Sequence, residues 1–172
     1  RDTRFSLYGK RSFYKDLDEK SNYGLGFKIK QSLGNYQYLK FDYGYSDNIY
    51  LREYIDVDQG ILDFIYLGSN CYFDRTRVSI DYESTYLKNK SKINVQYLFE
   101  TQFYNKFFTE FDLRINGLKV KYSKKNNKNK YFVKIGYAYA KNITLNDITL
   151  STSYMDRGYK EYNLNMSYDH QL

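Results

Sequence analysis

Apolar and polar residues alternate along most of the chain, most clearly over residues 161–172. One parity of this stretch is apolar or aromatic apart from one histidine, and comprises Tyr162, Leu164, Met166, Tyr168, His170 and Leu172. The other parity is polar throughout, and comprises Glu161, Asn163, Asn165, Ser167, Asp169 and Gln171. Successive side chains of a β-strand point to opposite faces. The pattern therefore predicts a strand with one apolar and one polar face.

The same alternation recurs from the first residues onward, and short polar clusters separate its segments. It predicts strands at about 4–14, 22–33, 38–45, 49–57, 60–73, 77–86, 92–100, 107–115, 118–123, 131–140, 148–154 and 159–172. Segment 60–73 is apolar on both faces, so its orientation stays open. The sequence leaves no room for helices between these strands. The expected fold is all-β, with ten to twelve antiparallel strands connected up and down.

Turn signals define the predicted strand ends. Gly34-Asn35, Ser46-Asp47-Asn48 and Asp156-Arg157-Gly158 are rich in residues that favour turns. Asn116-Gly117 is the strongest hairpin signal, because both residues tolerate the positive φ of a type I′ turn. We expect the basic segment 124–130 to be a solvated loop, with contact to an anionic surface as the alternative.

Three features favour a closed membrane barrel over a soluble sheet. The segments are about nine to twelve residues long, as a tilted membrane-spanning strand requires. Tyr and Phe recur near strand ends on the apolar face, where an interfacial girdle is expected. Charges such as Lys28, Asp81 and Lys134 fall in mid-strand on the polar face, which must therefore meet water or opposed charges. The alternative is a sheet whose apolar face is covered by a partner.

Composition agrees with one domain spanning residues 1–172. Mean hydropathy is −0.77, and no apolar run approaches the eighteen residues of a membrane helix. Strand-built spans do not raise hydropathy, because half of each strand is polar. The strand pattern begins almost at Arg1, so we expect a mature or trimmed segment, the C-terminal part of a longer chain being one possibility.

Residues suited to catalysis or metal binding are few. The chain has one histidine, His170, and one cysteine, Cys71, so we expect neither a metal site nor a cofactor. The carboxylate pairs Asp81/Glu83 and Glu110/Asp112 are expected to pair with neighbouring cations and not to act as a glycosidase pair. We expect no enzymatic activity. Nucleic-acid binding is disfavoured because the aromatics lie opposite the charges.

The charged positions of the polar face are the candidate site. Such a balanced set of charges could either cross-link a narrow barrel or line a polar pore, and the sequence leaves both open. The candidate solute-contacting residues are Lys28, Lys30, Lys40, Asp42, Arg77, Asp81, Glu83, Glu110, Asp112, Arg114, Lys119, Lys121 and Lys134.

The closing segment resembles the last strand of Gram-negative outer-membrane β-barrels, which alternates apolar residues back from a terminal aromatic. Here Leu172 takes the terminal place, and His170 interrupts the row. The resemblance implies an outer-membrane location, contact with lipid and lipopolysaccharide, and recognition of the closing strand by the barrel-assembly machinery.

In its pattern the whole chain is similar to small outer-membrane channels, YaiO-type barrels and the barrels of exopolysaccharide-export porins. That similarity implies a porin-like channel that passes small polar solutes or exports a saccharide. The alternative is a structural or adhesive barrel with a plugged lumen and no transport.

Overall fold

The computed structural model describes residues 2–13, 21–53, 70–87, 90–105, 111–126, 128–143 and 158–170. These residues form eight β-strands: β1 (Thr3–Ser12), β2 (Asn22–Gly34), β3 (Gln37–Glu53), β4 (Asn70–Tyr86), β5 (Ser91–Tyr104), β6 (Leu113–Asn126), β7 (Asn129–Asn142) and β8 (Tyr159–His170). The all-β prediction is confirmed. No helix in the described part of the chain is long and apolar enough to cross a membrane.

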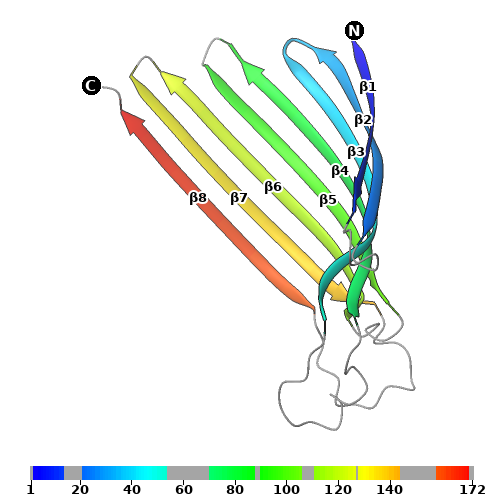
Figure 1. Cartoon of the computed structure of the whole chain (residues 1–172). Coiled ribbons are helices and arrows are strands. Elements are labelled where there is room, and N and C mark those ends of the chain that lie inside the picture. The colour runs from blue at the N-terminus through cyan, green and yellow to red at the C-terminus, as the bar shows by residue number, and fades with distance from the viewer. Residues whose placement is uncertain are drawn as a thin grey trace.

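All eight strands belong to one sheet, in the order in which they occur along the chain (Figure 1). Each strand pairs antiparallel with the next, from β1·β2 to β7·β8. The up-and-down connectivity expected from the short polar turns is therefore confirmed. Short connections, such as those from β2 to β3 and from β6 to β7, can join only antiparallel neighbours. The segments 54–69 and 143–158, which link β3 to β4 and β7 to β8, are longer, so their length alone does not require antiparallel pairing.

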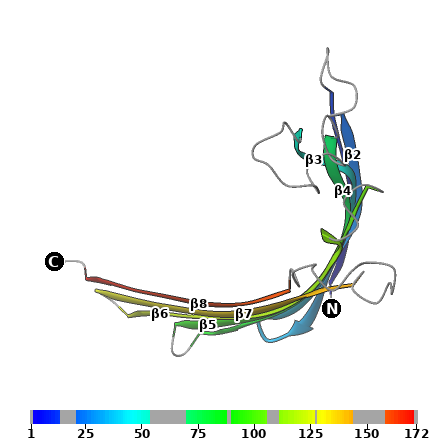
Figure 2. The ribbon, with the colours of Figure 1, turned by 90° about the horizontal axis from the view of Figure 1, so that it is seen from below.

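The sheet is curved and open (Figure 2). Within the described residues β1 and β8 are its edge strands, and each pairs with a single neighbour. The predicted closed barrel of ten to twelve strands is thus only partly present, as one open sheet of eight strands. The predicted strand 148–154, residues 60–69 of the predicted strand 60–73, and Leu172 lie outside the described residues.

The predicted turn at Asn116-Gly117 is wrong. Both residues lie inside β6, where Asn116 pairs with Phe99 and Tyr139, and Gly117 pairs with Leu98 and Ala138. The turn preference of the dipeptide is local, whereas β5 and β7 provide a continuous ladder of partners on both sides of β6. Residues 113–115 of the predicted strand 107–115 therefore belong to the same strand as the predicted strand 118–123, and residues 107–110 lie outside the described residues.

The predicted turn at residues 46–48 is also wrong, because the chain continues through it as β3. The β3·β4 register shifts between Ser46 and Ile49, and Asn48 has a φ of 47°. Asp74 of β4 accepts a hydrogen bond from the Asn48 backbone N–H at 2.9 Å, which holds the irregular backbone against the sheet. The turn-forming residues thus produce a bulge, in which the extra residue is absorbed within the strand.

Local turn chemistry does decide the connection between β2 and β3. Asn35 and Tyr36 link β2 to β3 with φ values of 47° and 61°, as a type I′ turn requires, and Gly34 ends β2 with a φ of 94°. The tight turn thus lies one residue later than the predicted Gly34-Asn35. The expected loop 124–130 is mostly strand, because β6 continues to Asn126 and β7 begins at Asn129. Its lysines Lys124, Lys125 and Lys130 are therefore fixed on a sheet.

The convex face of the sheet is apolar and uncovered in the described structure. Leu7 is 75% exposed, Tyr162 is 76% exposed and Met166 is 66% exposed. Ring contacts between neighbouring strands organise this face, as in the pairs Phe5–Phe27 at 6.0 Å and Phe27–Phe41 at 5.7 Å between centroids. Exposure of so much apolar surface to water is costly, so covering this face would be favourable.

Candidate functional site

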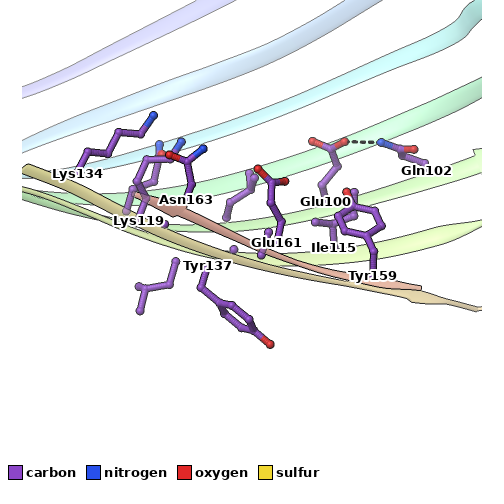
Figure 3. A pocket seen from close by; sticks show the side chains of 15 residues that line it. Glu100, Gln102, Ile115, Lys119, Lys134, Tyr137, Tyr159, Glu161 and Asn163 are labelled. Atoms are coloured by element: carbon purple, nitrogen blue, oxygen red, sulfur yellow. Dashed lines mark hydrogen bonds between the residues drawn. The ribbon is translucent and has the colours of Figure 1, made fainter. Parts of the chain in front are cut away.

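The charged residues gather on the other face, which lies on the inside of the curve. Residues paired directly across antiparallel strands project to the same side of a sheet. The registers therefore set Lys28 beside Asp42, and Lys40 beside Asp81. In Figure 3, Lys119, Lys134 and Glu161 rise from one side of the ribbon while Tyr137 points the other way. We call this side the concave face.

Ion pairs on the concave face join neighbouring strands. Lys28 of β2 contacts Asp42 of β3 at 3.1 Å between Nζ and Oδ2. Glu83 of β4 lies between two cations: Lys40 of β3 at 2.9 Å and Lys92 of β5 at 3.0 Å. Its side chain is 15% exposed, so these contacts form in a partly desolvated place. Asp42 of β3 and Glu83 of β4 are thus engaged within the sheet.

Asp81 is held by amides instead of cations. Its carboxylate accepts hydrogen bonds from Asn94 at 3.3 Å and from Gln96 at 3.0 Å, both on β5. Asp81 and Glu83 therefore have the paired-carboxylate spacing seen in the sequence, but each is bound by its own neighbours. The expected pairing with neighbouring cations is therefore found for Glu83, whereas the hydrogen-bond partners of Asp81 are amides.

Tyr8 of β1 is a member of this face that the sequence did not single out. Its hydroxyl crosses over β2 and donates to Asp42 Oδ1 at 2.9 Å. The path is open because Gly26 and Gly44 lie beneath the ring; a Cβ added at Gly26 would come within 2.5 Å of the Tyr8 hydroxyl. Tyr8 alternates in step with Arg4 and Lys10, so the sequence could have placed it on the polar face, but its position opposite Gly26 of β2 needed the strand register.

The lysines of β6 and β7 have a different environment. Lys121 lies directly opposite Lys134, and Lys119 lies two residues before Lys121 on the same face. The ion pairs found among the described residues involve only Lys28, Lys40 and Lys92 as cations. The concave face is thus neutralised around β3 and β4 and carries excess positive charge around β6 and β7.

Three shallow hollows lie along the concave face. The hollow over β5–β8 has a volume of about 350 Å³, and its lining includes Glu100, Lys119, Lys134 and Asn163 (Figure 3). A second hollow of about 460 Å³ includes Tyr8 and Arg77, and a third of about 310 Å³ includes Glu83 and Lys121. Each contains charged groups beside uncharged ones, which suits polar solutes better than apolar ligands.

Most of the predicted site residues lie together on the concave face. The registers place there Lys28, Lys30, Lys40, Asp42, Arg77, Asp81, Glu83, Lys119, Lys121 and Lys134. Lys30 lies over the ring of Tyr38, with Nζ 4.0 Å from the centroid. The alternation of polar and apolar residues was enough to predict the face of these positions, because no bulge lies between these charged residues of any one strand.

The three other predicted site residues, Arg114, Asp112 and Glu110, are not among those that the registers place on the concave face. Arg114 pairs with Thr101 and Lys141 on the convex face, so its assignment to the polar face is wrong. The error follows from the missing turn, since continuous alternation places Ile115 with Lys119 on the concave face and Arg114 opposite.

Asp112 is buried just before β6 and accepts a hydrogen bond from the Tyr104 backbone N–H at 2.7 Å. Glu110 lies outside the described residues.

Reactive or metal-binding groups do not converge in the described region. No group of three or more His, Cys, Asp or Glu residues there could hold a metal ion. His170 lies at the end of β8 with its Nδ1 2.6 Å from Asn129 Oδ1, in the exposed row of Tyr168 and Met166. Cys71 is buried at the start of β4.

Comparison of the chain with protein-family models, curated proteins and solved structures gave no match.

Proposed function

We propose that this chain forms a membrane-spanning β-barrel channel in a Gram-negative outer membrane and passes small polar solutes or saccharide through a charge-lined lumen. The observation that carries the proposal is the division of one curved sheet into an apolar convex face and a charged concave face. Leu7 and Met166 represent the first face, and the Lys40–Glu83–Lys92 cluster represents the second. Lipid outside and water inside would satisfy both faces at once.

Strand length supports a membrane span. The described strands run from 10 residues in β1 to 17 residues in β3 and β4. A tilted strand needs about 9–11 residues to cross a bilayer, whereas strands of soluble proteins centre on about 5–6. The tilted rings of Tyr131 and Tyr168 also contact each other, with centroids 5.1 Å apart, near one end of β7 and β8, where a membrane-facing surface would place an aromatic girdle.

Closure of the sheet is part of the proposal. Among the described residues β1 and β8 each have an edge without a paired strand, and each unpaired backbone group costs several kcal/mol in hydrocarbon. We propose that further strands pair with these edges to give a barrel of ten to twelve strands. Outer-membrane lipid and lipopolysaccharide would cover its exterior, and the assembly machinery would recognise the closing strand. No catalytic step or cofactor is involved.

The barrel that we propose has an open lumen with ion pairs along its wall. Each ion pair among the described residues joins adjacent strands, as in Lys28–Asp42 and Lys40–Glu83. Pairs of this kind stabilise the wall and leave other polar groups of the concave face free to contact solutes. The plugged structural barrel remains the alternative that the conductance measurement tests.

Single-channel conductance of the refolded full chain in a planar bilayer tests this function. We expect a heat-modifiable, inserted protein with steady conductance and anion preference. Neutralising Lys119 and Lys121 to Gln should reduce that preference, and Arg114→Gln on the convex face should leave it unchanged. An inserted protein without conductance would favour the structural barrel, and failure to insert would refute the membrane assignment.

A further inference from the structure

The cluster formed by Lys119, Lys121 and Lys134 is an arrangement that needs an explanation. Lys121 and Lys134 occupy directly opposite positions on β6 and β7, and all three lysines are half-buried. Like charges placed directly opposite each other destabilise a sheet. We call these three residues the lysine cluster.

The described residues contain no ion pair that relieves the lysine cluster. The neighbouring strands β5 and β8 carry Glu100 and Glu161 in the same hollow; Glu100 accepts a hydrogen bond from Gln102 at 2.8 Å, and neither acid is among the ion pairs of the described residues. On β4, two strands from β6, Glu83 is held by Lys40 and Lys92, and Asp81 accepts hydrogen bonds from the amides of Asn94 and Gln96. The repulsion between the lysines would therefore be offset by a bound anion. Lysine ammonium groups commonly bind phosphate and carboxylate as point charges.

Side-chain amides border the lysine cluster on both sides. Across the sheet, one row runs through Gln96, Lys119, Gly136 and Asn163, and the next runs through Asn94, Lys121, Lys134 and Asn165. Figure 3 shows Lys119, Lys134 and Asn163 side by side at one end of the hollow. Amides both donate and accept hydrogen bonds, so they suit the hydroxyl groups of a solute.

We propose that the lysine cluster and its amide border bind a small polyhydroxy solute that carries a divalent oxyanion, of which a sugar phosphate is the simplest example. The ammonium groups take the oxyanion, and Asn163, Asn165 and Gln96 take the hydroxyls. Gly136 leaves the floor of the site without a side chain between Lys119 and Asn163. The inference rests on the proposed function, because solutes must reach the concave face.

Equilibrium binding of glucose 6-phosphate to the full chain, refolded in non-ionic detergent at low ionic strength, tests the site. The variant Lys121→Gln/Lys134→Gln should bind at least about tenfold more weakly, which is ~1.4 kcal/mol. The matched control is Lys125→Gln/Lys130→Gln. It removes another directly opposite pair from the same two strands and the same face, at the hairpin end. We expect its affinity to match that of the unmodified chain.

Inorganic phosphate and glucose distinguish the two parts of the site. Each should bind more weakly than glucose 6-phosphate, because each lacks one half of the recognised chemistry. Equal affinity for phosphate and glucose 6-phosphate would overturn the polyhydroxy assignment, and equal loss of affinity in both double variants would overturn the location. The binding assay needs no conduction. A conducting protein that fails to bind therefore refutes the site alone, and a binding protein that fails to conduct refutes the channel alone.

Discussion

The ring of Tyr8 on β1 lies over Gly26 on β2, so that its hydroxyl reaches Asp42 on β3 at 2.9 Å. The contact spans three consecutive strands and depends on the missing side chain of the glycine. It couples the edge strand to the ion pair between Asp42 and Lys28. One packing relationship therefore fixes both the edge of the sheet and part of its charged face.

Gly26→Ala should destabilise the protein. The new Cβ would lie 2.2 Å from the Tyr43 carbonyl oxygen and 2.5 Å from the Tyr8 hydroxyl, so backbone or ring must move. Overpacking of this kind costs about 1–3 kcal/mol. Urea unfolding of the refolded chain in micelles measures the cost. Gly136→Ala is the control, because its Cβ would meet Asn163 at an ordinary 3.5 Å; similar losses in both variants would contradict this account.

Gly117→Ala should leave stability unchanged or raise it by up to about 1 kcal/mol. Gly117 lies in mid-strand, and a Cβ there would meet Leu98 at 3.5 Å, which is a normal contact. Alanine also restricts the unfolded chain more than glycine does. If Asn116-Gly117 were instead a type I′ turn, alanine would be strained at positive φ and stability would fall. The same unfolding assay decides between the two structures of this segment.

Glu83→Gln should reduce the free energy of unfolding by about 1–2 kcal/mol, because it leaves Lys40 and Lys92 without their shared carboxylate in a partly desolvated place. Asp42→Asn should cost less than about 1 kcal/mol. It removes one ion pair whose lysine side chain is 57% exposed, and the new amide can still accept from Tyr8. The difference should shrink at high salt. A larger loss from Asp42→Asn would show that the Glu83 cluster is not the main charge contact of the wall.

Leu164→Lys should impair insertion into lipid vesicles, because Leu164 is 64% exposed on the convex face of β8. A lysine facing lipid near the bilayer midplane costs about 2–4 kcal/mol. Asn163→Lys is the matched control, since it adds the same charge one residue earlier on the concave face. Equal insertion of both variants, measured by vesicle flotation and heat-modifiable gel mobility, would refute the assignment of the convex face to lipid.

Local polarity was enough to predict the strands and to separate the two faces wherever the alternation is unbroken. Lys28, Asp81 and Lys134 were placed correctly because each strand keeps its register across them. The same reasoning failed for Arg114, because it depended on a turn at Asn116-Gly117. A turn preference acts over a few residues, whereas pairing with β5 and β7 acts along the whole strand.

The sequence by itself determined the all-β class, the up-and-down order and the amphipathic character of the sheet, because the period of two and the short polar connections are local properties. Only the tertiary structure decided that the dipeptide at 116–117 continues a strand and that Ser46–Asn48 form a bulge. It also decided which charges meet: Glu83 with Lys40 and Lys92, and Lys121 opposite Lys134. Such contacts depend on the register between strands, which alternation along one strand does not encode.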